Sequence, residues 1–246
     1  MTSLLQTRGL TLKFGGVVAA DGIDFDLQAG ERLAVIGANG AGKTTFINMV
    51  TGYIKPSAGE IRFDGIDITP MHPRQIVHRG IGRSFQLPQL FLDHTVRESI
   101  ELAVAARQGR MRLLRAMGRC VDAGEVDHVL EVVGLAARAS DRCGSLPEGH
   151  RKLLDIAMAL VLRPKLLIMD EPTSGVAADE KHPLMATIMK ALSERSVTAM
   201  FVEHDVDIVH QYATRVAAWI SGRIAADGPP EVVMNDPEVR SVVLGH

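Results

Sequence analysis

The sequence predicts an α/β fold: a mostly parallel sheet covered by helices, preceded by antiparallel strands and interrupted by an inserted helical lobe. Three observations predict it. Apolar runs of strand length alternate with helical segments, as in parallel sheets buried on both faces. A glycine-rich loop at residues 37–45 joins one such run to a helix. From residue 87 to about 162, β-branched runs disappear and helical periodicity replaces them.

The first elements are antiparallel strands. Residues 4–29 alternate between apolar and polar side chains, and residues 23–27 do so with strict period two. A turn at 28–31 leads into a short apolar run at 33–36, which predicts a buried strand at 32–36.

The loop after that strand has the sequence GANGAGKTT, which fits the pattern G-x-x-x-x-G-K-[ST] with a strand before it and a helix to about residue 50 after it. Glycines let successive N–H groups point inward and form an anion-binding nest at a helix N-terminus. Lys43 can reach β- and γ-phosphates, and Thr44 offers a hydroxyl to Mg²⁺. The loop therefore predicts the core of a P-loop NTPase that binds a nucleoside triphosphate with Mg²⁺. The predicted nucleotide-binding residues of the loop are Asn39, Gly40, Ala41, Gly42, Lys43, Thr44 and Thr45.

The next elements prepare the inserted lobe. We expect a strand at 60–63 that ends in a hairpin at Asp64-Gly65, a helix at 73–79 and a strand at 81–85. In the lobe, helices are expected at 96–106 and 126–133, and a strongly apolar helix at 153–162. Residues 107–119 carry five arginines, which indicate either a solvated face or contact with a partner or anionic lipid.

Strands return after the lobe. Residues 165–170 and 198–203 form buried runs, and 216–220 with 223–226 form a late hairpin. The first run ends in Asp170, followed by Glu171, at the edge where ligands of open α/β sheets bind. Asp170 can hold the Mg²⁺ shell, and Glu171 is placed to orient or deprotonate an attacking water.

Charge and composition limit the partners. The formal net charge is −2, which gives no electrostatic footprint for nucleic acid. Cys120 and Cys143 have no metal-ligand spacing and are expected to be free thiols in a reducing cytosol. No apolar run approaches the ~18 residues of a membrane span, and no signal-peptide pattern opens the sequence. We therefore expect a cytoplasmic chain, without excluding a membrane partner.

Together these motifs resemble an ABC-transporter ATP-binding subunit over nearly the full length of the chain. The resemblance implies a single ABC ATPase domain, with 1–86 and 163–246 as nucleotide-binding core and 87–162 as helical subdomain. It also implies three site roles. Phe14 lies where the family stacks an aromatic ring on adenine, although a strand-end core residue is the alternative. Gln86 matches the glutamine that reaches Mg²⁺ and the water, and His204 matches the switch histidine that contacts the γ-phosphate.

The family's signature loop departs from its usual sequence, Leu-Ser-Gly-Gly-Gln. Here it is Leu146, Pro147, Glu148, Gly149 and His150. In the family the serine hydroxyl contacts ATP held by the opposite subunit, but proline has neither a hydroxyl nor an N–H. Proline suits a helix start, so the following helix should form. Glu148 would repel a triphosphate unless it is turned away or neutralised by Arg151 or Lys152. We expect an ATP sandwich with weaker signature contacts.

A second departure is Ala177, where the family usually has a carboxylate in a turn across the dimer interface. This change puts communication between the two ATP sites in doubt. Neither departure touches the phosphate loop, Asp170 or Glu171, so ATP hydrolysis is still expected.

Several stretches narrow the resemblance to the ATPase subunits of branched-chain amino acid importers: 14–19, 80–86, 90–91, 95–96, 235–239 and 243–245. Urea and short-amide importers and the lipopolysaccharide-export ATPase are close relatives. The implied partners are transmembrane permease subunits, a second ATPase subunit (a copy or a paralogue) in a head-to-tail dimer, and indirectly a periplasmic or extracellular binding protein. The implied location is peripheral, on the inner face of the cell membrane.

Other classes of function fit less well. Non-transport ABC ATPases of DNA repair or translation carry a long coiled-coil insertion or two cassettes, and this chain has neither. A regulatory module that binds ATP without turnover is suggested by the altered signature and opposed by Lys43, Asp170, Glu171 and His204. A GTPase is disfavoured because no Asn-Lys-x-Asp motif occurs.

Overall fold

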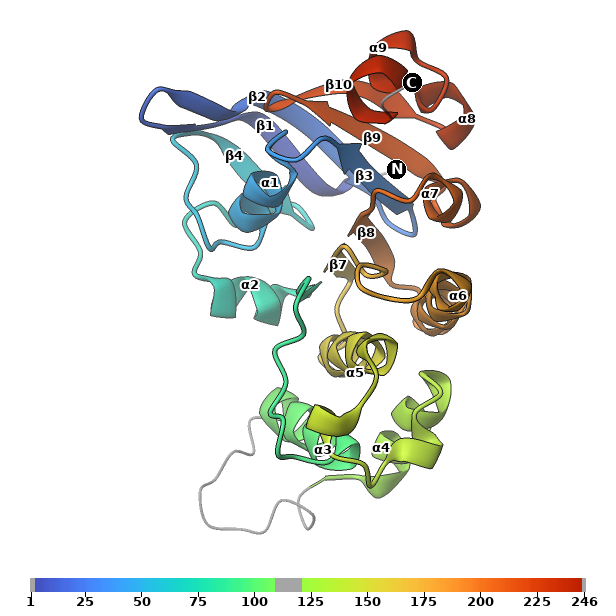
Figure 1. The fold of residues 1–246 in the computed structure, drawn as a ribbon. Coiled ribbons are helices and arrows are strands. Elements are labelled where there is room, and N and C mark those ends of the chain that lie inside the picture. The colour runs from blue at the N-terminus through green and yellow to red at the C-terminus, as the bar shows by residue number, and fades with distance from the viewer. Residues whose placement is uncertain (1–2, 109–120, 245–246) are drawn as a thin grey trace.

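The computed structural model describes residues 3–108 and 121–244. Two sheets lie at one end of the molecule, and a group of helices lies at the other (Figure 1). The α/β fold with N-terminal antiparallel strands and a mostly parallel second sheet is confirmed.

The first sheet is antiparallel, as the alternating N-terminal sequence predicts. Its strand order is β2-β1-β4-β5. The strands are β1 (Ser3–Phe14), β2 (Val17–Gln28), β4 (Ala58–Phe63) and β5 (Ile66–Asp67). The β1–β2 hairpin closes where Phe14 pairs with Val17.

The second sheet has the order β10-β9-β3-β8-β7-β6, and every neighbouring pair except β10-β9 is parallel. Its strands are β3 (Arg32–Gly37), β6 (Ile81–Ser84), β7 (Leu166–Asp170), β8 (Thr198–Val202), β9 (Arg215–Ile220) and β10 (Arg223–Gly228). All residues of β7 and β8 are buried, which explains why these strands are mostly apolar rather than alternating, apart from Thr198 at the start of β8 and Asp170 at the end of β7.

Separate hydrophobic clusters cover the two faces of this sheet. On one face, α1 (Lys43–Val50) packs with the first sheet, and Phe46 lies against Trp219 with ring centroids 5.2 Å apart. On the other face lie α6 (Ala178–Glu194) and α7 (Val206–Tyr212). The remaining short helices are α2 (Pro73–Arg79), α8 (Pro230–Val233), α9 (Pro237–Val239) and the π-helical turn η4 (Arg240–Leu244).

A third hydrophobic cluster joins α3 (Val96–Arg107), α4 (Ala123–Val132) and α5 (Glu148–Val161). These helices lie together in the lower part of Figure 1. Two 3₁₀ turns, η2 (Ala136–Arg138) and η3 (Cys143–Ser145), connect α4 to α5. Helix α3 begins with a capping box in which Thr95 accepts from the N–H of Glu98, while the Glu98 carboxylate accepts from the N–H of Thr95.

The segment with five arginines is only partly described. Arg110, Arg112, Arg115 and Arg119 lie outside the described residues, as does Cys120. Arg107 ends α3, and its guanidinium donates to both carboxylate oxygens of Glu125, at 2.7 Å each. It is therefore part of an ion pair rather than a solvated face.

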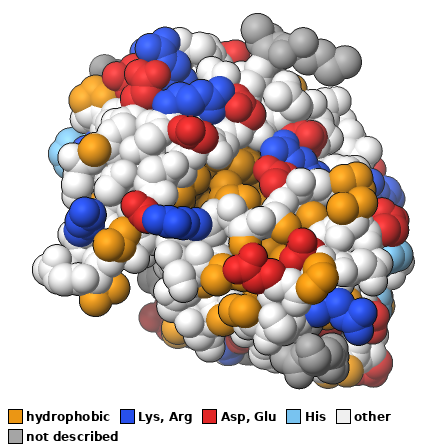
Figure 2. All heavy atoms as spheres, turned by 90° about the horizontal axis from the view of Figure 1, so that it is seen from above, with side chains coloured by type: hydrophobic (Ala, Val, Ile, Leu, Met, Phe, Trp, Pro, Cys, Tyr) orange, Lys and Arg blue, Asp and Glu red, His pale blue; other side chains and the backbone are white. Residues whose placement is uncertain are grey.

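Two expectations for the described residues are the absence of a membrane span and the absence of a large basic patch. No described helix is both long and apolar enough to cross a membrane. Acidic and basic side chains are interspersed with hydrophobic ones on that face (Figure 2). The described cysteine, Cys143, is buried and free, with its sulfur 3.2 Å from the Ser99 hydroxyl.

Candidate functional site

The phosphate loop runs from the end of β3 to the start of α1. Gly37, Gly40 and Gly42 have φ of 155°, 81° and 103°, in the region that favours glycine. A Cβ on Gly42 would lie 2.5 Å from the carbonyl oxygen of Ala19, and one on Gly37 would lie 2.5 Å from that of Trp219. Both glycines are therefore needed for backbone curvature and for close packing. Asn39, Gly40 and Thr44 are exposed at the loop surface, Gly42 and Thr45 are half-buried, and Ala41 is buried.

Lys43 is 6 % exposed, and its ammonium donates to the carbonyls of Gly37 (2.5 Å) and Ala38 (3.1 Å). Burial lowers the pKa of Lys43, and the nearby carboxylates of Glu171 and Asp170 oppose that shift. The cation of the loop therefore belongs to one electrostatic site with Asp170, which ends β7, and Glu171, which follows it.

Asp170 is held by Arg83, which the sequence did not single out. The guanidinium of Arg83 lies 3.3 Å from Oδ2 of Asp170 and donates to Oδ1 of Asn48 at 2.7 Å. It also lies over the rings of Phe85 and Tyr53, 4.9 and 5.6 Å from their centroids. Burial raises the pKa of Asp170, and the charge of Arg83 opposes that rise. The sequence did contain one signal that could have indicated Arg83, a charged residue within the short strand β6.

Glu171 is the centre of the site. It follows β7 with a left-handed backbone (φ 50°), and its N–H donates to the carbonyl of Val202 at 3.1 Å. Its Oε2 accepts from the Gln86 amide at 2.6 Å, and its Oε1 lies 3.2 Å from Nε2 of His204. Strands β6, β7 and β8 are adjacent and parallel, so their carboxyl ends bring Gln86, Glu171 and His204 together.

Two buried charged residues support this centre. The ammonium of Lys152 donates to the main-chain carbonyls of Glu171 (2.8 Å) and Gln86 (3.2 Å). The carboxylate of Glu203 accepts from the N–H (2.9 Å) and hydroxyl (2.7 Å) of Thr173, and from the N–H of His204 at 3.2 Å. Glu203 was not predicted, although a carboxylate directly after a buried strand could have indicated it.

The signature segment spans the start of α5 (Glu148–Val161). Pro147 is the N-cap residue of α5, so the helix forms after proline as expected, five residues earlier than the apolar periodicity indicated. Arg151 lies 3.9 Å from the Glu148 carboxylate, whereas Lys152 is hydrogen-bonded to carbonyls. Leu146 is buried. Gly149 and His150 line a cavity of about 200 Å³ with Val176. Among the described residues, no hydrogen bond joins 146–150 to 37–45.

Phe14 lies at the tip of the β1–β2 hairpin. Its side chain is 52 % exposed, so it is not a core residue at the end of a strand, which was the alternative interpretation. Further along the hairpin, the main-chain N–H of Asp21 donates to the carbonyl of Gly222, and the N–H of Gly222 donates to the carbonyl of Ala41 at 2.9 Å. The hairpin is therefore connected to the phosphate loop through the 221–222 turn.

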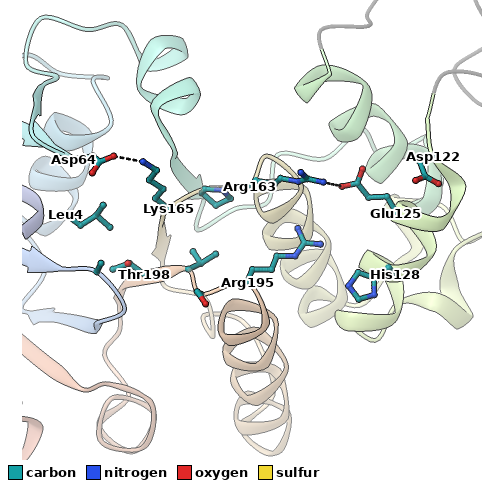
Figure 3. A pocket seen from close by; sticks show the side chains of 13 residues that line it. Leu4, Asp64, Asp122, Glu125, His128, Arg163, Lys165, Arg195 and Thr198 are labelled. Carbon is teal, nitrogen blue, oxygen red and sulfur yellow. Dashed lines mark hydrogen bonds and ion pairs between the residues drawn. The ribbon is translucent and has the colours of Figure 1, made fainter.

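A hollow of about 940 Å³ lies away from the phosphate loop (Figure 3). Lys165 and Thr198 line it at the amino ends of β7 and β8, opposite to the ends that carry the predicted site. In it Arg163 pairs with Glu125 at 3.1 Å, and Lys165 pairs with Asp64. Arg107 and Arg163 lower the pKa of Glu125 to about 2.

The chain is similar in sequence and in structure to known proteins. The sequence profile of the family described as "ABC transporter" matches residues 20–174. The high-affinity branched-chain amino acid transport ATP-binding protein BraF of Pseudomonas aeruginosa is 34% identical, with 98% of each chain covered. The corresponding protein LivG of Escherichia coli is 31% identical, again with 98% of each chain covered.

Solved structures agree with the sequence relatives. The ADP conformation of MJ1267, an ATP-binding cassette of an ABC transporter, has a TM-score of 0.83 at 30% identity, with 100% of both chains covered. The protein cbiO1 of Clostridium perfringens, part of the ABC transporter complex cbiONQ, has a TM-score of 0.83 at 29% identity, covering 98% of this chain and 94% of its own.

Proposed function

The chain belongs to the ABC transporter ATP-binding family, and we propose that it is the ATP-hydrolysing motor of an importer for branched-chain or other hydrophobic amino acids. The relatives BraF and LivG, named for branched-chain amino acid transport, support this substrate class. Related urea or amide importers and lipopolysaccharide exporters are the alternatives for the cargo.

One observation carries the proposed catalysis: Glu171 has one carboxylate oxygen on Gln86 and the other beside His204. In this arrangement Glu171 orients a water and accepts its proton as the water oxygen attacks the γ-phosphorus. The bond from the γ-phosphorus to the bridging oxygen breaks, and ADP leaves with that electron pair. His204 contacts the γ-phosphate, and the N–H groups of 39–45 with Lys43 hold the β- and γ-phosphates.

The donor set also fits Mg²⁺. A threonine hydroxyl, an amide oxygen and a carboxylate, from Thr44, Gln86 and Asp170, are the hard oxygen ligands that this ion prefers. Bound Mg²⁺ neutralises charge on the β- and γ-phosphates. Arg83 holds Asp170 at 3.3 Å and so fixes the carboxylate that would serve the ion.

The site is completed by a second ATPase subunit, a copy or a paralogue, in a head-to-tail dimer. Residues 146–150 make no hydrogen bond to the phosphate loop of their own chain among the described residues, so their contact with ATP would be made in the partner. Residues 87–162 would move as a lobe, since α3, α4 and α5 share their own hydrophobic cluster. By this proposal, Gln86 moves with the permease and so transmits its state to the ATP site. Phe14 stacks on the adenine ring.

By binding its proposed partners, the chain would lie at the inner face of the cell membrane. Permease subunits would bind the lobe, and a periplasmic or extracellular binding protein would deliver the cargo to them. ATP binding closes the dimer and hydrolysis reopens it, which transmits the motion of the lobe to the permease.

The test is uptake in cells that lack this chain, complemented with wild type or Lys43→Ala. We expect wild type to restore uptake of labelled leucine and the variant not to restore it, since the variant loses the cation on the γ-phosphate. Purified wild type should hydrolyse ATP, and the purified variant should not. Restoration of urea or amide uptake instead of leucine would move the cargo to the alternatives. Equal hydrolysis by both proteins would contradict the proposed site.

A further inference from the structure

Lys152 is a buried cation whose hydrogen-bond partners are main-chain oxygens. It lies in the second turn of α5 and is 3 % exposed. Its ammonium donates to the carbonyl of Glu171 at 2.8 Å and to that of Gln86 at 3.2 Å. One side chain from α5 therefore joins the two residues that meet at the hydrolytic carboxylate.

We propose that Lys152 is a positioning residue that couples the signature segment of α5 to the carboxylate of Glu171 and the amide of Gln86. The inference rests on the proposed function, in which 146–150 contacts the ATP of a second subunit. It adds a link by which that contact reaches the hydrolytic residues of this subunit.

The Glu171 end of the link holds a strained residue. A left-handed backbone is unfavourable for a non-glycine residue and persists only where its surroundings hold it in place. Here the N–H of Glu171 is fixed by Val202 and its carbonyl by Lys152. With both backbone groups of Glu171 held, its side chain is aimed at Gln86 and His204.

The Gln86 end is held by two side chains of α5. Lys152 donates to the carbonyl of Gln86, and Asp155, three positions later, accepts from the N–H of Phe85 at 3.1 Å. One turn of α5 thus supplies a donor and an acceptor to consecutive residues. A shift of α5 would move residues 85–86 with it and would act on the backbone of Glu171 through the same ammonium.

The charges around Lys152 allow an ammonium to stay in this place. Burial lowers its pKa, and the carboxylates of Glu148, Glu203, Glu171 and Asp155 oppose that shift. Removal of the ammonium would take this donor from the carbonyls of Glu171 and Gln86, and a hydrogen bond to a charged group is worth more than one between neutral groups.

In this chain the link through Lys152 could replace a missing contact. The family resemblance implies that a carboxylate at position 177 serves communication between the two ATP sites, and this chain has Ala177 there. Lys152 connects the signature segment and Glu171 without that carboxylate, so a route between the sites is kept.

The experiment compares Lys152→Met, Lys152→Arg and, as a control, Lys190→Met, which changes an exposed lysine of α6. The kcat and KM of ATP hydrolysis and the affinity for a fluorescent ATP analogue are measured on the full chain. For Lys152→Met we expect kcat to fall at least about tenfold, as for a lost charge-assisted hydrogen bond, while KM and affinity change less than about threefold. Arginine, which keeps a cationic donor, should restore at least about a third of kcat.

A wild-type kcat in Lys152→Met, or equal kcat in the methionine and arginine variants, would overturn the inference. If the methionine variant does not fold, Lys152→Gln replaces it, and the same comparison with arginine decides. The proposed function itself is contradicted by a different result, namely that Lys43→Ala hydrolyses ATP as fast as wild type.

Discussion

The side-chain amide of Gln86 lies 2.6 Å from Oε2 of Glu171, although the two residues are 85 positions apart in the sequence. Gln86 belongs to the segment that leads from β6 into the helices α3–α5, whereas Glu171 directly follows β7. Any displacement of that segment therefore changes a hydrogen bond to the carboxylate that we propose activates water.

Glu171→Gln should bind ATP but hydrolyse it at least ~100-fold more slowly, because the amide cannot accept the proton of the water. Phosphate release and binding of a fluorescent ATP analogue measure the two properties separately. The variant keeps the size of the side chain, so retained affinity serves as its folding control. Hydrolysis within a few-fold of wild type would show that another group is the base.

Pro147→Ser should strengthen ATP-driven dimerisation in the Glu171→Gln background. The serine hydroxyl supplies the contact that proline lacks, and one hydrogen bond corresponds to about a two- to tenfold change in dimer affinity. Pro147→Ala is the matched control, since it removes the ring without adding a hydroxyl. Sedimentation with ATP and Mg²⁺ measures the affinity. If serine and alanine behave alike, the hydroxyl contributes no contact at this site.

Ala177→Asp should stabilise the chain. Ala177 is the N-cap residue of α6, has extended backbone angles (φ −59°, ψ 146°) and makes no side-chain cap hydrogen bond. A capping side chain contributes about 0.5–2 kcal/mol, which raises the Tm by roughly 2–4 °C per kcal/mol for a domain of this size. Ala177→Asn tests the cap without added charge. Thermal unfolding without nucleotide is the measurement, and an unchanged Tm in both variants would contradict the prediction.

Glu125→Gln should remove a pH-dependent part of the stability. Arg107 and Arg163 lower the pKa of Glu125 from 4.5 to about 2. A lowered carboxylate pKa gives stability that is present above pH 4.5 and is lost as the pH falls towards 2. Wild type should therefore be more stable than the variant at pH 6, and the difference should disappear near pH 2.

Urea unfolding at several pH values measures this difference. Glu131→Gln is the control, since Glu131 is exposed on the same helix and forms no ion pair among the described residues. A difference between wild type and Glu125→Gln that does not depend on pH would show that the ion pairs with Arg107 and Arg163 do not set it.

The sequence predicts the parts of the fold that depend on local patterns. The phosphate loop has a recognisable sequence motif. Strands β3, β7 and β8 have clear apolar signatures because nearly all of their residues are buried. Helix α6 was not predicted, since its first turns are polar and contain Pro183, and its buried face begins only at Leu184. The start of α5 was also missed, because its first turn carries polar residues.

The site residues divide in the same way. Asp170, Glu171 and His204 lie at or just after the ends of recognisable strands. The partners of Arg83, Lys152 and Glu203 are set by the fold, and the sequence does not reveal them. The described hydrogen-bond partners of the Lys152 ammonium are both main-chain carbonyls, which carry no residue identity. Only the folded chain brings such groups together.

Trp219 gives the chain its own optical reporter of the phosphate loop. It is the single tryptophan, it is fully buried, and its ring packs on Phe46, which lies in the helix that Lys43 begins. Its carbonyl oxygen would be 2.5 Å from a Cβ on Gly37, so its backbone also lies against the loop. Selective excitation of one indole therefore follows nucleotide binding by changes in emission, without a dye, a fusion or an introduced cysteine.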